Sequence, residues 1–123
     1  MARAIAGVAG ALVAWIVAAT LGNLALRLAL PGYAEAEKAM VFTLAMLAGR
    51  LAVGAISSYC AGAAVGWIAK GNLRAAMIAA GILVALFIPV HYNLWTTFPL
   101  WYHFVFFASL VVLTVMGARL YAR

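Results

Sequence analysis

Long apolar runs dominate the sequence and constrain its fold more than any other feature. Of the 123 residues, 70% are hydrophobic and only 8% are charged. Soluble domains contain about 45–50% apolar and about 25% charged residues. A soluble fold of this size also lacks the interior volume to hide so much apolar surface. The sequence therefore predicts that lipid, rather than water, surrounds the chain.

The apolar runs divide the chain into four spans. A membrane-spanning helix needs roughly 20 apolar residues, so four spans and short connections use the whole length. Pro31-Gly32 ends the first run, and Lys70-Gly71-Asn72 forms a tight turn after the second. We expect one all-α domain over residues 1–123, an integral membrane four-helix bundle. Its spans are predicted at about residues 4–27, 44–69, 73–90 and 100–118.

The first run begins like a secretory signal peptide. Arg3 precedes it, and Val17-Ala18-Ala19 is placed like a cleavage site. The run continues to Leu30, however, which is too long for the apolar core of a signal peptide. We therefore expect a retained first span.

Basic residues are distributed unequally between the predicted loops. Cytoplasmic loops of membrane proteins carry an excess of lysine and arginine. Five basic residues lie on one side of the membrane, and only Lys38 lies on the other, with Arg27 near that boundary. We therefore predict a multi-pass protein of the cell inner (plasma) membrane with both termini in the cytoplasm. The net charge of +6 does not indicate nucleic-acid binding, because these residues lie at helix ends rather than on one face. The basic side holds Arg3, Lys70, Arg74, Arg119 and Arg123.

Polar, aromatic and titratable residues gather between Pro89 and His103. His91 and His103 are the only two histidines of the chain. One interpretation is an interfacial belt, in which aromatic rings lie at headgroup depth and the histidines hydrogen-bond among them. A pocket for a ligand or a quinone is a second interpretation, and a metal or haem site is a third. The surrounding residues are Tyr92, Asn93, Trp95, Trp101 and Tyr102.

Arg50 lies inside the second run, where charge is costly. An arginine at the bilayer centre costs about 2.5–3.5 kcal/mol on insertion scales. Only Glu35 and Glu37 are acidic, and neither lies in a predicted span. We expect Arg50 to bind a carbonyl, an amide such as Asn23, water or a molecule that the chain does not supply. Counted inward from Lys38, Arg50 lies near the middle of the membrane. We favour a second register, in which a span of about 20 residues that ends near Ile68 places Arg50 just below the outer surface.

At that depth Arg50 is level with Arg27 and the histidine segment, which predicts one cluster at the outer face. Guanidinium groups bind carboxylate and phosphate in bidentate geometry. The expected ligand is an anionic lipid, a quinone-like amphiphile or a small anion. The alternative is that each arginine extends separately to lipid headgroups. The predicted binding set is Asn23, Arg27, Arg50, His91, Tyr92, Asn93, Trp95, Trp101 and His103.

Small residues recur every four positions in the first two spans. Residues four apart share a helix face, and small side chains there let two helices approach closely. These stripes either pack the two spans together within one chain or form a homodimer or a contact with a larger membrane complex. They are Ala6, Gly10, Ala14, Ala18 and Gly22 in the first span, and Gly54, Ser58, Gly62 and Gly66 in the second.

No catalytic motif accompanies these features in the sequence. It has no Ser/His/Asp set, no HExxH and no phosphate-binding glycine loop, and the single Cys60 cannot form an intramolecular disulfide. We expect a non-enzymatic subunit or an interaction or assembly protein for which the sequence requires no cofactor. A binding or transport module is the second hypothesis, and a membrane enzyme or haem protein that uses the histidines is the third.

With these elements placed, the chain resembles a loose group of short four-span bacterial membrane proteins of unknown function. The resemblance rests on the glycine- and alanine-rich first span, the Pro31-Gly32 turn and the small-residue second span. It also includes the hairpin with Ile88-Pro89 and Pro99-Leu100-Trp101. It implies a four-span bundle and no particular activity. Small multidrug exporters are similar in length, but they depend on a membrane-embedded glutamate that this chain lacks.

Overall fold

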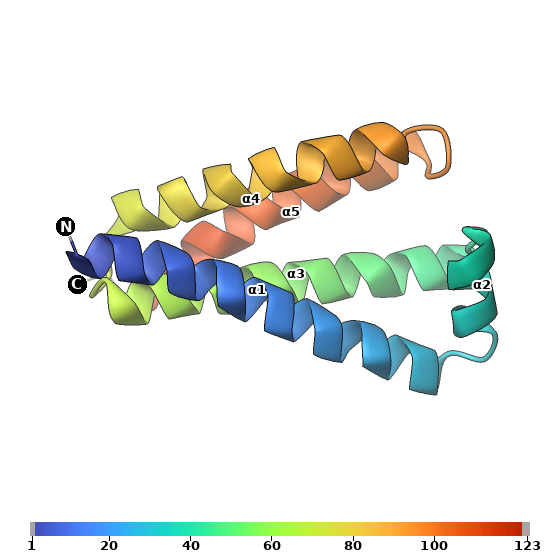
Figure 1. The fold of residues 1–123 in the computed structure, drawn as a ribbon, viewed down its shortest axis with the longest axis horizontal. Helices are drawn as coiled ribbons and strands as arrows, with labels where there is room; N and C mark the ends of the chain where they lie inside the picture. The colour runs from blue at the N-terminus through green and yellow to red at the C-terminus, as the bar shows by residue number, and fades with distance from the viewer. Residues whose placement is uncertain (1, 122–123) are drawn as a thin grey trace.

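The computed structural model describes residues 2–121, and these form five α-helices and no strand (Figure 1). The predicted all-α class is confirmed. Four of the helices are long and apolar enough to cross a membrane, namely α1, α3, α4 and α5. The helices are α1 (Ala2–Ala29), α2 (Tyr33–Ala39), α3 (Leu44–Ile68), α4 (Leu73–Asn93) and α5 (Leu100–Arg119).

The short helix α2 separates the first two spans. Gly32 precedes it with φ 79°, and Met40 follows it with φ 57°, both in the left-handed region. The chain then turns into α3, whose first turn is capped by Thr43, because its hydroxyl accepts a hydrogen bond from the Met46 amide at 3.2 Å. Glu35, Glu37 and Lys38 therefore belong to a separate connecting helix.

Helix α3 packs along both α1 and α5, and α4 packs mainly on α5. In Figure 1, α1 runs beside α3 and α4 runs beside α5 at the end away from the termini, and we call these the two pairs. Both described chain ends and the α3–α4 turn lie at one end of the bundle, which we call the terminal end (Figure 1). Helix α2 and the α4–α5 loop lie at the other, which we call the loop end. The two pairs diverge toward the loop end. Four basic residues lie at the terminal end, Arg3, Lys70, Arg74 and Arg119, whereas Arg123 lies outside the described residues.

Small residues of α1 allow close packing on α3. A Cβ atom at Gly22 would lie 2.7 Å from the side chain of Val53, and one at Gly10 would lie 2.5 Å from that of Ile68. Real Cβ atoms do not approach other atoms so closely, so a larger residue at either position would force the side chain of Val53 or Ile68 to move. The first and second spans therefore pack together within one chain.

The stripe on α3 packs on α5 instead of on the stripe of α1. A Cβ atom at Gly62 would overlap the backbone of Thr114, and one at Gly66 would lie 2.9 Å from Cα of Ala118. Gly117 of α5 in turn lies against the backbone of α3. Helix α3 is thus the central helix, which contacts α1 on one side and α5 on the other.

A buried polar contact joins three helices in the middle of the bundle. The indole N–H of Trp15 donates to Ser58 Oγ at 3.1 Å, and this hydroxyl donates to the Gly54 carbonyl at 2.7 Å. Thr114 Oγ1 donates to the Ser58 carbonyl at 3.3 Å. Because lipid offers no hydrogen bonds, polar groups at this depth need partners within the protein. These contacts fix α1 and α5 to α3.

Candidate functional site

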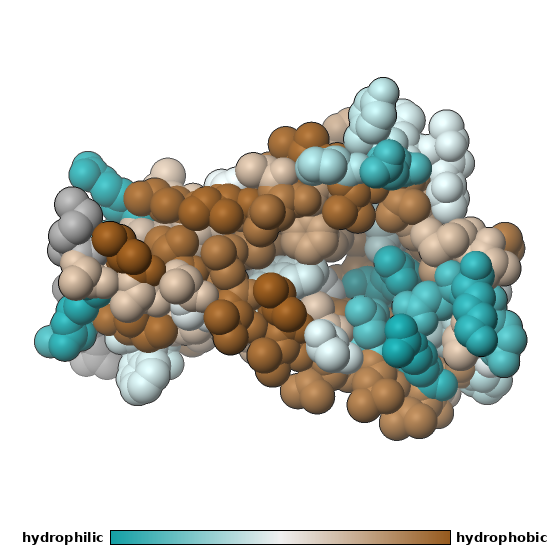
Figure 2. All heavy atoms as spheres, viewed as in Figure 1, coloured by the Kyte–Doolittle hydropathy of each residue, from teal (hydrophilic) through white to brown (hydrophobic). Residues whose placement is uncertain are grey.

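A cleft of about 190 Å³ lies between the two helix pairs. Figure 2 shows a hollow at the loop end, between α4–α5 and α1–α3, with hydrophilic atoms inside it. The part nearer the terminal end is lined by the aromatic residues Trp15, Phe87 and Phe106. The part nearer the loop end contains the polar side chains Asn23, Arg50, His91 and Tyr102.

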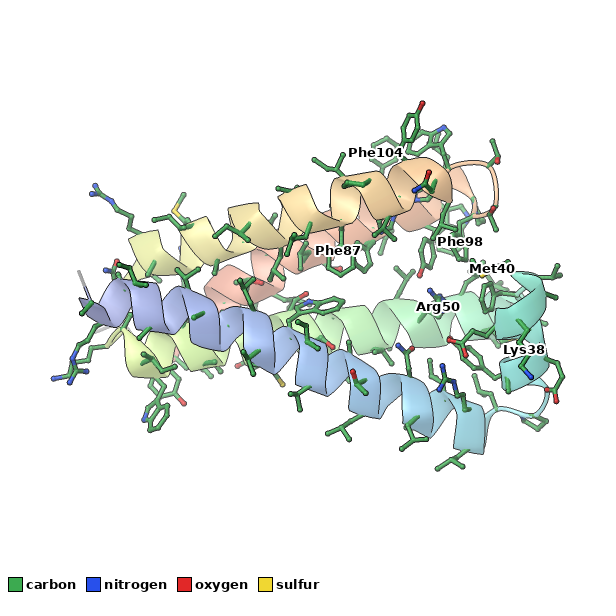
Figure 3. All side chains as sticks on the ribbon, viewed as in Figure 1. Lys38, Met40, Arg50, Phe87, Phe98 and Phe104 are labelled. Carbon is green, nitrogen blue, oxygen red and sulfur yellow. The ribbon has the colours of Figure 1, made fainter. Side chains whose placement is uncertain are left out.

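Arg50 enters the cleft from the second turn of α3 and is held by aromatic side chains (Figure 3). Its Nη1 donates to the hydroxyl of Tyr33 at 3.0 Å, and its Nε donates to the hydroxyl of Tyr102 at 3.3 Å. The guanidinium carbon lies 4.8 Å from the ring centroid of Phe42 and 5.5 Å from that of Phe98, which are cation–π contacts. These protein partners are phenols and aromatic rings rather than the carbonyl or the amide of Asn23 that we expected from the sequence.

No carboxylate group of residues 2–121 neutralises Arg50. The chain has only two acidic side chains, Glu35 and Glu37. Glu37 binds Arg27 at 2.8 Å, which is the only ion pair within residues 2–121, and Glu35 is exposed on α2. Arginine is always charged in proteins, whereas a phenol is a neutral partner. Arg50 therefore carries a positive charge into the cleft without a protein counter-ion.

His91 and His103 contact each other across the α4–α5 hairpin. Their Nδ1 atoms lie 2.5 Å apart, and their ring centroids are 4.8 Å apart. Both are buried, with exposed fractions of 6% and 1%. Twelve residues separate them along the chain, and the turn of the hairpin brings them together.

Aromatic rings enclose the histidine pair and connect it to Arg50. Trp95 stacks on His103 at 4.8 Å, and the ring of Phe106 lies 4.6 Å from that of His91. The ring of Tyr102 lies 6.3 Å from that of His91, and its hydroxyl accepts the bond from Arg50. The arginine and the histidines therefore form one connected cluster.

The structure brings together four of the nine residues in the predicted binding set. Asn23, Arg50 and His91 line the cleft, and His103 contacts His91 directly. Trp95 covers His103 from outside and is itself 49% exposed.

The remaining predicted residues lie away from the cleft. The side chain of Arg27 is 49% exposed and bound to Glu37. Tyr92, Asn93 and Trp101 are exposed on the outer surface of the hairpin. A common depth in the membrane therefore did not place Arg27 beside Arg50, because the two residues face different neighbours.

Sequence reasoning missed the partners of Arg50 and the inner wall of the cleft. Tyr33 reaches Arg50 only because α2 turns back over the N-terminal end of α3. Nothing in the residue pattern indicated this turn. Trp15 stands alone in the first span, without the polar neighbours that drew attention to the hairpin. Its one available signal was that a tryptophan far from the membrane surface needs a hydrogen-bond partner.

Within the described part of the chain, no three His, Cys, Asp or Glu side chains come close enough to hold a metal ion. Cys60 is exposed on α3. No family model matches the chain, and neither a curated protein nor a solved structure matches it. The resemblance to short four-span bacterial proteins thus remains an expectation, and function has to be inferred from the cleft.

Proposed function

We propose that this chain is a membrane-embedded binding or transport module whose cleft holds the acidic group of a small ligand beside Arg50. One observation carries the proposal, namely that Arg50 lines a cleft with only neutral protein partners. A charge removed from water is costly unless it is paired. An anionic ligand would supply the missing charge, and a guanidinium group suits carboxylate and phosphate geometry.

We further propose that the loop end faces outward from a bacterial inner membrane and that both termini lie in the cytoplasm. The terminal end carries Arg3, Lys70, Arg74 and Arg119, and no acidic residue of the described chain accompanies them. At the loop end, Glu35 and Glu37 offset Arg27 and Lys38. This asymmetry supports the orientation, because cytoplasmic loops are enriched in basic residues. The cleft would then lie in the outer leaflet.

The competing function is a non-enzymatic subunit or assembly protein, which would not need the cleft. Exposed aromatic side chains on the α4–α5 hairpin support it, because Tyr92, Trp95 and Trp101 are 81%, 49% and 43% exposed. The buried glycines of the α3 stripe already face α5 of the same chain. A homodimer or a larger complex would therefore use the aromatic hairpin rather than that stripe.

Native mass spectrometry of protein purified in mild detergent, without added ligand, tests the two functions against each other. The wild type and an Arg74→Leu control should carry an added ligand mass that Arg50→Leu lacks. Arg74 is a suitable control because it is an exposed arginine at the terminal end. Circular dichroism and gel filtration identify the variants that remain folded. Equal ligand mass in folded Arg50→Leu, or bare protein that co-purifies with a stoichiometric partner, would favour the subunit.

A further inference from the structure

The contact between the two histidines restricts where their protons lie. A neutral imidazole has one N–H donor and one bare acceptor nitrogen, so one Nδ1 atom of the pair donates and the other accepts. Nε2 of His103 is buried without a partner among residues 2–121. Buried N–H groups without a partner are rarer in proteins than acceptors without one. This favours a proton on Nδ1 of His103, which donates to His91.

The tautomer of His103 then determines that of His91. Because Nδ1 of His91 accepts, the proton of His91 lies on Nε2. His91 lines the cleft, and no group of the described chain accepts a hydrogen bond from this nitrogen. Nε2 of His91 is not buried, because within residues 2–121 the only buried side-chain nitrogen or oxygen without a partner is Nε2 of His103. The N–H group is therefore available to a molecule in the cleft.

The cleft thus presents two donors from neighbouring side chains. The guanidinium group of Arg50 can only donate, and Nε2–H of His91 donates as well. Tyr102 lies between them, in contact with both. A head made of acceptor oxygens, as in a carboxylate or a phosphate, matches this pair of donors. An amine would bring its own N–H groups and a positive charge to the same place.

The cleft is too small to enclose a drug-sized ligand. Pockets for drug-sized molecules measure about 300–1,000 Å³, whereas this cleft measures about 190 Å³. It is open to the outside of the bundle, because Val90 both lines it and is 44% exposed. The helices α1 and α4 diverge on the way to the loop end (Figure 1). The space-filling view shows a hollow on this side (Figure 2), so a hydrocarbon chain could pass there into the surrounding lipid.

We propose that the ligand is an amphiphile of the bilayer whose carboxylate or phosphate head is held by Arg50 and His91, while its hydrocarbon chain leaves between α1 and α4. This proposal rests on the proposed function and names its ligand class. His103 does not touch the ligand. It is a positioning residue, which keeps the proton of His91 on the cleft side.

Fluorescence of Trp15, which lines the cleft, provides the test. Replacing Trp67, Trp95 and Trp101 by Phe leaves Trp15 as the only tryptophan. The full chain in detergent is titrated with stearate carrying a nitroxide quencher near its head, and separately with the methyl ester of the same compound. We expect saturable quenching by the acid and no saturation with the uncharged ester. Native mass spectrometry of the wild type with stearate repeats the measurement without the tryptophan replacements.

Variants of the histidines test the donor. His91→Leu removes the N–H and should weaken binding of the acid about ten- to a hundredfold, the value of one hydrogen bond to a charged group. His91→Gln offers an amide N–H at about the reach of Nε2 and should retain most of the affinity. His103→Asn keeps a donor near the position of Nδ1 and should bind better than His103→Leu. If Gln at position 91 binds as weakly as Leu, the assigned role of the N–H is wrong.

Inorganic phosphate separates failure of this inference from failure of the proposed function. Calorimetric binding of phosphate that requires Arg50, combined with equal unsaturable quenching by acid and ester, would overturn the amphiphile but keep an anion-binding module. If the wild type bound neither the acid nor phosphate, both the amphiphile and the proposed anion-binding function would be wrong. Saturable binding of the acid that is lost in Arg50→Leu supports both.

Discussion

The hydroxyl of Tyr33 accepts a hydrogen bond from Nη1 of Arg50 at 3.0 Å, which ties the connecting helix α2 to the cleft. Tyr33 is fully buried, at 0% exposure, whereas the ion pair between Arg27 and Glu37 joins α1 to α2 at the surface. Water and salt screen a surface pair, so the buried contact should matter more for the position of α2.

Removing the Tyr33 hydroxyl tests this contact. Tyr33→Phe leaves one N–H of Arg50 without its protein partner, so we expect a loss of about 1–2 kcal/mol in the free energy of unfolding. Tyr92→Phe removes the same atom from a side chain that is 81% exposed, and it should change nothing measurable. Thermal unfolding followed by circular dichroism in detergent compares the two. Equal melting curves for both variants would contradict the structural importance of the contact.

The exposed position of Arg27 makes a prediction that differs from the one made on sequence. Arg27→Gln should leave both the melting temperature and the bound ligand mass unchanged, because its partner Glu37 lies outside the cleft. Native mass spectrometry compares the bound ligand mass of Arg27→Gln with that of Arg50→Gln. Loss of ligand in both variants would return Arg27 to the binding site.

The glycines of the bundle should differ in their response to an added methyl group. Gly62→Ala places a Cβ atom on the Thr114 backbone and should destabilise the protein by at least about 1–3 kcal/mol. Gly81→Ala meets nothing within 4 Å, and it should stabilise α4 by about 0.5–1 kcal/mol because alanine favours a helix. Unfolding in increasing sodium dodecyl sulfate gives both values. A stable Gly62→Ala variant would mean that α3 and α5 do not pack as described.

The bond between Trp15 and Ser58 should contribute modestly. Single and double variants Trp15→Phe and Ser58→Ala form a cycle whose coupling energy isolates this pair. Side-chain hydrogen bonds between membrane helices average about 0.6 kcal/mol and reach about 1.7 kcal/mol, so we expect a value in that range. A coupling energy of zero would place the indole N–H elsewhere.

The proposed orientation predicts which positions react from outside the cell. In a Cys60→Ala background, Thr97→Cys in the α4–α5 loop should react with a membrane-impermeant maleimide on intact spheroplasts. Ala2→Cys, at the terminal end, should react only after the membrane is permeabilised. The opposite pattern would invert the topology and move the cleft to the cytoplasmic leaflet.

Hydropathy was sufficient to predict the all-α class, because bilayer thickness sets the length of each apolar run. Depth in the membrane also grouped Arg50 with the two histidines, which the structure brings together, but it grouped Arg27 with them as well, and Arg27 lies on Glu37 at the surface. Depth could not identify what binds Arg50, since Tyr33 and Phe42 reach it only through the turns around α2. Residue spacing likewise shows which face of a helix is narrow, but not which neighbour covers it. For this reason the spacing did not predict that the α3 stripe packs on α5.

The close backbone contacts of Gly62, Gly66 and Gly117 all lie in the half of the bundle near the terminal end. Among the described residues of the opposite half, where the cleft lies, side-chain contacts link the two pairs instead, such as those of Arg50 with Tyr102 and Phe98. The half near the terminal end should therefore be the more rigid one, because backbone contacts yield less than side-chain contacts. When a ligand binds or leaves, we expect the distance between the two helix pairs to change only at the loop end. Spectroscopic labels near Thr97 should therefore report the change, whereas labels near Ala2 should not.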